Sequence, residues 1–279
     1  MLTQPAFAYR GIEVLDIDEL VSRIDQALDR SLDQHPHREL IKKAAKSPEW
    51  VRSESGDRYL VYQVADEKRG RIWHMQAGYV PTLRQISSNL YGEIKSQGVR
   101  HIDSLIQICN ELLDLRTHEH RGIAFDWCYR MKRHYEPRHY SIFEHWATNH
   151  LTDWGSVDDF CTHTMGYFLC RYPQFAPKIK RWAKSENPWI RRAAAVSFIC
   201  GLRRGAFLDH IFEVADALLT DQHKYVQWGH GWMLKEATKY YQDQVFEYVM
   251  RNKVFMPRPA LRYAIEKMPK ELKVKAMKK

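Results

Sequence analysis

Apolar residues recur at the three- and four-residue spacing of amphipathic helices along most of the chain. From residue 101 onward the pattern predicts helices and almost nothing else. We expect them at 101–115, 119–134, 139–149, 156–171, 176–185, 188–203, 207–219, 223–241, 244–252 and 258–267. Asn187-Pro188 places a capping residue before a proline that suits a first helical position. Ser156 with Asp159 resembles a capping box.

The first third of the chain has a different pattern. Residues 13–32 and 37–46 fit amphipathic helices, and another helix is predicted from Pro81 to about Ile94. Between them, residues 58–64 and 71–75 are rich in β-formers and flank a charged turn, which predicts a small β-hairpin or an irregular loop near 58–75.

The predicted helices form pairs with a regular period. The second helix of each pair begins near residues 119, 156, 188 and 223, a spacing of 32 to 37 residues. Such a period is typical of stacked HEAT-like repeats, which form a curved solenoid with one concave face, and the alternative is an irregular helical bundle. We therefore expect an all-α domain over 1–279. It would hold N-terminal helices in 1–50, an irregular or hairpin insert in 51–80, repeats in 81–268 and a basic tail in 269–279.

The net charge of +9 is unevenly distributed. Residues 171–205 hold nine bases and one acid, and residues 251–279 hold ten bases and two acids. Basic blocks within helices favour a polyanion partner such as nucleic acid, whereas the final residues 270–279 fit a solvated tail.

Several classes of protein are disfavoured. No apolar run reaches the roughly 18 residues of a membrane span, and residues 1–18 lack a secretory-signal pattern, so we expect a cytoplasmic protein and no membrane partner. The five cysteines are odd in number and unpaired in spacing, which favours reduced core residues. His118 and His120 point about 200° apart on a helix and are poor joint metal ligands.

Candidate chemistry lies at equivalent positions of successive repeats. Trp154 and Asp158 are four residues apart and share one side of a helix. Arg192 follows Asp158 by 34 residues, and Trp232 lies about one repeat further on, so the four could converge on one face. Each also has a structural interpretation: Asp158 could complement a helix dipole, the tryptophans could pack in a core, and Arg192 could be a solvated base. Gly229 and Gly231, inside a helix, require close packing or a close ligand.

In combination, three motifs resemble those of the AlkD-type DNA alkylation repair glycosylases. They are residues 154–158 (WGSVD), 189–194 (WIRRAA) and 231–236 (GWMLKE), joined by the early segment 78–84 (GYVPTLR). The resemblance covers roughly residues 75–268. It implies a stack of HEAT-like repeats with a basic concave groove.

The resemblance also implies an activity, namely excision of cationic N3- and N7-alkylated purines from duplex DNA. The implied enzyme is a monomer, is nucleoid-associated, uses no metal or cofactor and has no deep pocket for a flipped base. Asp158 matches the catalytic carboxylate, Trp154 and Trp232 match sugar-contacting aromatics, and Arg192 matches an arginine that holds the DNA backbone. Further DNA-contact candidates are Arg191, Trp189, Lys235 and Tyr79. Tyr79 or Trp73 could supply an N-terminal aromatic that the family has and that cannot be placed here.

Two other functions remain open. A non-catalytic helical-repeat scaffold could bind DNA or a protein through the same groove, because fold alone does not imply activity. An RNA-binding repeat protein would carry recognition side chains once per repeat, and no such regular code is visible.

Overall fold

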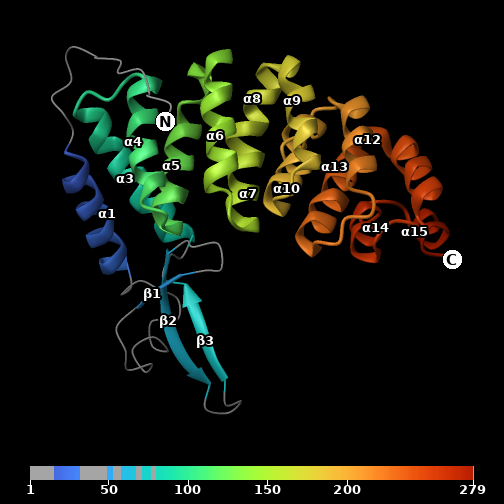
Figure 1. The fold of residues 1–279 in the computed structure, drawn as a ribbon, viewed down its shortest axis with the longest axis horizontal. Coiled ribbons are helices and arrows are strands. Elements are labelled where there is room, and N and C mark those ends of the chain that lie inside the picture. Colours follow the sequence, from blue (N-terminus) through green and yellow to red (C-terminus); the bar gives the residue numbers. More distant parts are fainter. Residues whose placement is uncertain (1–15, 32–48, 53–57, 67–70, 77–79, 279) are drawn as a thin grey trace. The chain divides into compact units, whose positions relative to one another are not determined.

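The computed structural model describes residues 16–31, 49–52, 58–66, 71–76 and 80–278. By its internal contacts the chain divides into two compact units, Met1–Arg130 and Met131–Lys279. The helical-repeat class is confirmed, and Figure 1 shows helices side by side within each unit. None of the described helices is both long and apolar enough to cross a bilayer. The predicted helix at 37–46 lies outside the described residues.

The first unit combines four helices with a small sheet. The helices are α1 (Ile17–Ser31), α3 (Val80–Ser96), α4 (Ile102–Asp114) and α5 (His118–Arg130). Apolar residues three and four apart bury one stripe of each helix, including Leu20 and Ile24 on α1 and Leu105 and Cys109 on α4. Trp127 of α5 is fully buried and donates a 2.9 Å hydrogen bond to the Ser87 carbonyl of α3, which joins the two helices.

The predicted hairpin is present and carries an additional strand. Strands β2 (Arg58–Asp66) and β3 (Arg71–Gln76) pair antiparallel, with Val64 opposite Trp73. Strand β1 (Glu49–Arg52) pairs antiparallel with β2, so the sheet order is β1-β2-β3. The sequence did not predict β1, because four residues are too few to show a period of two.

The second unit is built from short helices. In chain order they are α6 (Tyr140–His150), α7 (Trp154–Phe160), α8 (Gly166–Arg171), α9 (Ala176–Lys180), α10 (Pro188–Val196), α11 (Ile199–Leu202), α12 (Leu208–Ala217), α13 (Lys224–Asn252), α14 (Arg258–Ala264) and α15 (Lys270–Met277). A π-helical turn (Cys161–Met165) joins α7 to α8. Four 3-10 turns complete the unit, at Lys132–His134, Pro137–His139, Pro173–Phe175 and Arg181–Lys184.

Successive repeats place α7, α10, α13 and α14 next to one another. Helix α10 contacts α7 on one side and α13 on the other, and α13 contacts α14. The second helices of the pairs begin at His118, Trp154, Pro188 and Lys224, within two residues of the predicted period. Helix α13 contains one non-helical residue, Tyr241, where the sequence predicted a break.

Two details differ from the sequence predictions. Helix α7 begins two residues early, because Asp153 rather than Ser156 caps it: the Asp153 carboxylate accepts a 2.8 Å hydrogen bond from the Ser156 backbone N–H. Residues 270–277, expected as a solvated tail, form helix α15, which contacts α13 and buries Ala276.

Candidate active site

An open pocket of about 790 Å³ lies in the second unit, where α7, α10, α13 and α14 meet. It brings together all four residues that the sequence placed on one face. Its lining consists of two carboxylates, two arginines, five aromatic rings and a proline: Trp154, Asp158, Arg192, Tyr225, Trp228, Trp232, Pro259, Arg262, Tyr263 and Glu266.

Helix α7 presents an aromatic ring and a carboxylate to the pocket. Trp154 is the first residue of the helix and its surface is 53% exposed, which is unusual for an indole without a ligand. Asp158 lies one turn later on the same side. The first turn of α7 contains no acidic residue, so Asp158 lies beyond the positions where a carboxylate best complements the helix dipole. This placement disfavours the capping interpretation of Asp158.

Asp158 and Arg192 form a close ion pair. The Arg192 Nε donates to Asp158 Oδ1 at 2.9 Å, and Nη2 donates to Oδ1 and Oδ2 at 2.7 and 2.9 Å. The Arg192 side chain is only 5% exposed and that of Asp158 is 22% exposed. Because both carboxylate oxygens are held by one planar guanidinium, the orientation of the carboxylate is fixed.

The environment of this pair favours the neutral form of the Asp158 carboxyl group. Burial raises the pKa of Asp158 above its ordinary value, although Arg192 opposes the shift. A buried carboxylate that has few solvent contacts would gain from a second positive charge placed beside it. The site is therefore suited to a cationic or cation-developing ligand.

Gly229 explains how Arg192 fits beneath α13. A Cβ atom at Gly229 would lie 3.1 Å from Arg192 Cγ and 3.3 Å from Nη1. The remaining guanidinium nitrogen, Nη1, donates a 2.5 Å hydrogen bond to the Tyr225 carbonyl on the same helix. Thus α13 both covers the arginine and orients it. The resemblance implied an arginine that grips the DNA backbone, whereas here all the hydrogen bonds found for Arg192 go to Asp158 and Tyr225.

Trp232 is held at the pocket by a charged cluster. Its indole N–H donates to Glu236 Oε1 at 3.2 Å. Arg203 and Lys267 also contact the Glu236 carboxylate, at 3.1 and 3.2 Å. Burial opposes ionisation of Glu236, but these two bases lower its pKa overall, so it remains an anion that can anchor the ring.

Helix α14 closes the far side of the pocket and was not predicted to contribute. Its pocket residues Pro259, Arg262 and Tyr263 follow an i, i+3, i+4 pattern, which places them on one helical face, and Glu266 follows in the turn after the helix. A Cβ at Gly231 would lie 2.6 Å from the Ala260 carbonyl oxygen and 2.8 Å from Tyr263 Cβ. Close helix packing, not a ligand, therefore requires Gly231. Continuing the repeat period of 32 to 37 residues by one step from Trp232 would have pointed to 264–269, a range that contains Glu266.

Lys235 supports this wall from outside the pocket lining. Its ammonium lies 3.8 Å from the centre of the Tyr263 ring and 3.4 Å from each Glu266 carboxylate oxygen. The side chain is only 9% exposed. Lys235 thus orients two pocket residues without itself lining the pocket.

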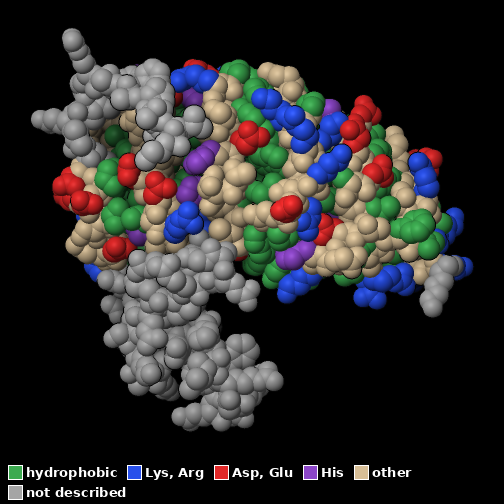
Figure 2. All heavy atoms as spheres, in the orientation of Figure 1, with side chains coloured by type: hydrophobic (Ala, Val, Ile, Leu, Met, Phe, Trp, Pro, Cys, Tyr) green, Lys and Arg blue, Asp and Glu red, His purple; other side chains and the backbone are tan. Residues whose placement is uncertain are grey.

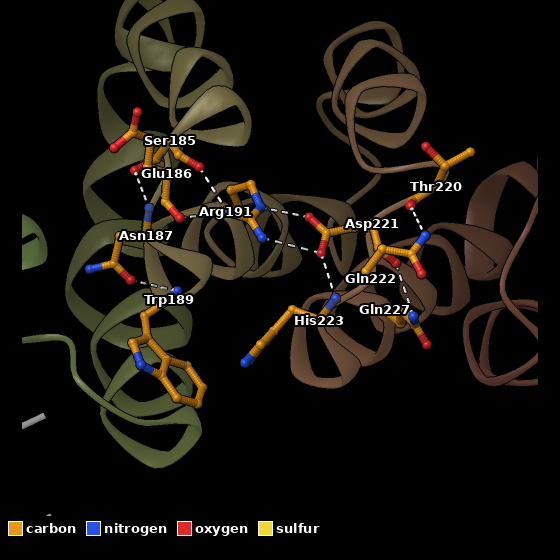
Figure 3. Close-up of polar contacts among 10 residues, drawn as sticks. All are labelled: Ser185, Glu186, Asn187, Trp189, Arg191, Thr220, Asp221, Gln222, His223 and Gln227. Atoms are coloured by element: carbon orange, nitrogen blue, oxygen red, sulfur yellow. Dashed lines mark hydrogen bonds and ion pairs between the residues drawn. The ribbon is translucent and has the colours of Figure 1, made fainter. Parts of the chain in front are cut away.

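Arg191 is not among the residues that line the pocket, and its guanidinium braces the start of α10 (Figure 3). Its guanidinium donates to both oxygens of Asp221, at 2.6 and 3.3 Å, and to the carbonyls of Ser185 and Glu186, both at 2.9 Å. Asp221 in turn accepts a 2.9 Å hydrogen bond from the His223 backbone N–H, just before α13. Arg191 therefore ties two successive repeats together, which accounts for its place beside Arg192.

Trp189 also lies outside the pocket lining, but it extends the row of rings beyond it. Its ring centre is 5.4 Å from that of Tyr225, which is 5.2 Å from that of Trp228. Tyr225 and Trp228 both line the pocket, and Trp228 is 43% exposed. Tyr79 lies outside the described residues.

The basic block at 171–205 is partly neutralised. Lys180, Arg191, Arg192 and Arg203 form ion pairs with acids elsewhere in the second unit. Figure 2 shows further Lys and Arg side chains over this part of the molecule, interspersed with acids. The charge available to a polyanion is therefore smaller than the sequence count suggests.

The residues that the structure describes contain no cluster of three or more His, Cys, Asp or Glu side chains that could hold a metal ion. What the pocket offers is a carboxylate of fixed orientation beside five aromatic side chains, of which Trp154 and Trp228 are exposed. Aromatic faces and a carboxylate both attract positive charge. The pocket can therefore stabilise a cation electrostatically, without any of its side chains forming a covalent bond to the ligand.

Comparison with known proteins agrees with this geometry. A structure of a predicted DNA alkylation repair enzyme from Enterococcus faecalis superposes with a TM-score of 0.61 at 18% sequence identity, covering 70% of this chain and 88% of the other, and so shares the fold. No curated protein sequence matches the chain. The family model for the DNA alkylation repair enzyme matches residues 77–268, a range that excludes the sheet and contains every residue of the pocket. The chain thus belongs to the DNA alkylation repair enzyme family and has a role in DNA alkylation repair.

Proposed function

We propose that the protein is a DNA glycosylase that excises cationic N3- and N7-alkylated purines from duplex DNA, acting as a monomer. The observation that carries the proposal is the Asp158 carboxylate, fixed by Arg192 at the base of a pocket with exposed tryptophans. Such a group fits a reaction whose transition state is a cation.

The chemistry follows from the substrate. Alkylation at N3 or N7 gives the purine a positive charge and weakens its bond to the sugar, so the base leaves without strong acid catalysis. Positive charge then develops on the deoxyribose. A carboxylate directed at the anomeric carbon stabilises that charge electrostatically and can orient the attacking water. Trp154 and Trp232 would add cation–π attraction of about 0.5–2 kcal/mol each.

Arg192 has a different role in this proposal from the backbone grip that the resemblance implied. Held by Asp158 and the Tyr225 carbonyl, it positions the carboxylate and keeps it ionised against the effect of burial. Other basic side chains would then contact the DNA phosphates, and among these Arg262 lines the pocket. Arg262 is therefore our candidate for the contact nearest the lesion.

The experiment is a base-release assay on duplex DNA that carries 7-methylguanine or 3-methyladenine. Asp158→Asn should lower the single-turnover rate by about two to three orders of magnitude, which corresponds to the roughly 2.7–4 kcal/mol lost with one electrostatic group. Asp159→Asn is the matched control, because Asp159 is the next residue on α7, is 43% exposed at its side chain and pairs with His163 outside the pocket. It should release bases at the wild-type rate.

Two results would contradict the proposal. If Asp158→Asn releases 7-methylguanine as fast as the wild type, the carboxylate is structural and the site is wrongly assigned. If the wild type binds duplex DNA but releases no alkylated base, the non-catalytic scaffold becomes the better account of the pocket, since a lesion could be bound there without being cleaved.

A further inference from the structure

Two cysteines that are distant in sequence meet at the contact between α8 and α11. Cys170 is the fifth residue of α8, and Cys200 is the second residue of α11. Their Sγ atoms are 3.6 Å apart, and both side chains are partly exposed. The other three cysteines, Cys109, Cys128 and Cys161, are buried. The sequence predicted five reduced core residues; all five are free thiols, but Cys170 and Cys200 are not in the core, which is a correction.

An arginine lies closer to one member of the pair than to the other. The Arg204 Nη1 is 2.8 Å from Cys200 Sγ and 4.0 Å from Cys170 Sγ. The same nitrogen donates a 2.6 Å hydrogen bond to the Cys200 carbonyl, which holds the guanidinium beside the sulfur. A positive charge at this distance favours the thiolate form of Cys200. The asymmetry of the contacts therefore assigns different roles to the two sulfurs.

The electrostatics agree with the geometry. Hydrogen bonds from the Cys170 thiol and from Arg204 lower the pKa of Cys200 to about 6, although burial opposes them. The adjacent Cys200 raises the pKa of Cys170, so that Cys170 keeps its proton and donates it to the neighbouring sulfur. A partly exposed thiolate next to a protonated thiol is the arrangement of a nucleophilic cysteine and a resolving cysteine.

We propose that Cys170 and Cys200 form a redox-active pair in which Cys200 reacts with hydroperoxides and Cys170 resolves the product to a disulfide. The Cys200 thiolate attacks the outer oxygen of the hydroperoxide, the O–O bond breaks, and an alkoxide or hydroxide leaves and takes up a proton. Cys200 is thereby oxidised to a sulfenic acid. The Cys170 sulfur then attacks Cys200 Sγ, an S–S bond forms, and water leaves with the Cys170 proton.

The pair needs little movement to close. The sulfurs must approach by about 1.5 Å to reach a disulfide bond length. The resulting bond would join α8 to α11 and would remove the thiolate partner of Arg204. The pair lies outside the pocket lining, so this chemistry is independent of the glycosylase proposal.

The test is mass spectrometry of the full-length protein after treatment with hydrogen peroxide. Non-reducing digestion should yield one peptide pair linked through Cys170 and Cys200, two mass units below the reduced sum, and dithiothreitol should reverse it. Cys109, Cys128 and Cys161 are internal controls and should remain reduced. An absence of the Cys170–Cys200 link, under conditions where another cysteine is oxidised or none is, would overturn the proposal.

Single variants test which sulfur reacts first. In Cys170→Ser, dimedone should trap a sulfenic acid at Cys200, whereas in Cys200→Ser no adduct should form at Cys170. Arg204→Met should slow alkylation of Cys200 by iodoacetamide at pH 7 by about tenfold and move its pH profile upward, because a higher pKa leaves less thiolate. An adduct at Cys170 in Cys200→Ser, or an unchanged pH profile in Arg204→Met, would refute the assigned roles. Circular dichroism of each variant checks that it is folded.

Discussion

At the scale of single residues, Asp158 and Arg192 form one ion pair, in which each side chain holds the other in place. The sequence suggested a carboxylate and a base that act separately on the sugar and on the DNA backbone. The structure instead joins them by three short contacts and buries the arginine almost completely. Any substitution at one of the two positions therefore removes the ion-pair partner of the other, so a loss of activity has to be measured together with stability.

Replacing both charges together separates a chemical role from a structural one. Asp158→Asn leaves the Arg192 cation buried without its partner, and we expect a loss of about 3–5 kcal/mol in the free energy of unfolding. The double variant Asp158→Asn with Arg192→Gln has no unpaired charge, so it should recover at least half of that loss. Base release should stay as low as in the single variant. Urea unfolding and base release, measured on the same samples, check this, and a double variant that recovers activity along with stability would show that Asp158 acts only through folding.

The pH dependence of base release should reflect the environment of Asp158. Stabilisation of a cation needs the carboxylate form, and burial raises the pKa of Asp158 above its usual range. Activity should therefore fall on acidification at a higher pH than it would for a solvated aspartate, and it should be flat in the neutral range. Single-turnover rates measured between pH 4 and 8 on 7-methylguanine give the profile. The Asp159→Asn control should show the same profile as the wild type, whereas a profile independent of pH would contradict the role of the carboxylate.

At the scale of helices, short elements are held in register by individual polar residues. Asp153 and Asn187 set the first residues of α7 and α10, and Arg191 ties α10 to the segment before α13. These contacts determine where Trp154, Asp158 and Arg192 point. Part of this could be read from the sequence, because Asn187-Pro188 is a strong start signal. The start of α7 was misjudged, since Asp153 and Ser156 are both good capping residues and only packing decides between them.

Arg191→Ala tests the brace between repeats. The variant leaves Asp221, whose side chain is only 7% exposed, without its cationic partner, and we expect a loss of about 3–5 kcal/mol in stability. Affinity for undamaged duplex DNA should change less than twofold at a temperature where the variant is folded. The comparison variant is Lys184→Ala, because Lys184 is an exposed basic residue in the same block. It should show the reverse: weaker binding to duplex DNA and an unchanged free energy of unfolding. A loss of DNA affinity specific to Arg191→Ala would restore it as a DNA contact.

In the first unit, Glu119 on α5 makes stability depend on pH. It is fully buried, no other described residue donates a hydrogen bond to its carboxylate, and burial raises its pKa to about 7, although its own backbone N–H and Arg121 oppose the shift. Because the folded pKa exceeds the unfolded one of 4.5, the folded state is favoured below pH 4.5 and loses stability as pH rises through 7. The difference corresponds to roughly 3 kcal/mol. Nearby Asp25 also raises the pKa of Glu119.

Glu119→Gln should remove this dependence. The variant should match the wild type in urea unfolding at pH 4.5 and should be more stable by up to about 3 kcal/mol at pH 8.5. Glu111→Gln, an exposed position on α4, is the control and should follow the wild-type curve. Equal stability of Glu119→Gln and wild type at both pH values would show that Glu119 finds another stabilising partner when ionised.

At the scale of the whole molecule, the sequence predicted the class of fold well and the second unit best. The repeat period depends on apolar spacing and start signals that are local, so the helix starts were within two residues. The pocket required contacts that are not local. Tyr225 and Trp228 of α13 were missed. Pro259, Arg262, Tyr263 and Glu266 were missed as well, because nothing in residues 258–266 distinguishes a lining face from a solvated one until α13 is packed against it. The curvature of the stack and the role of Tyr79 stay predictions.

Binding of DNA should be strongly salt-dependent, but less than the charge count suggests. Each phosphate neutralised contributes a slope of about −0.9 in log K against log salt concentration. Four of the nine bases in 171–205 already pair with acids of the protein. We therefore expect a slope of about −3 to −5 for undamaged duplex, measured by fluorescence anisotropy between 50 and 300 mM salt. Arg262→Ala should reduce its magnitude by about one, and an affinity independent of salt would argue against DNA as the partner.

The contact at Gly231 has a consequence for inheritance. Any change in the first or second base of a glycine codon specifies a residue with a side chain or ends the chain, and the first atom of that side chain would lie 2.6 Å from the Ala260 carbonyl oxygen. Natural variants at this codon should therefore push α14, with Arg262, Tyr263 and Glu266, away from α13 while Asp158 and Arg192 stay untouched. Loss of repair in a surviving lineage could thus begin at a codon whose amino acid does not contact the damaged DNA. A sequencing survey that inspects only Asp158 and Arg192 would score such an allele as intact.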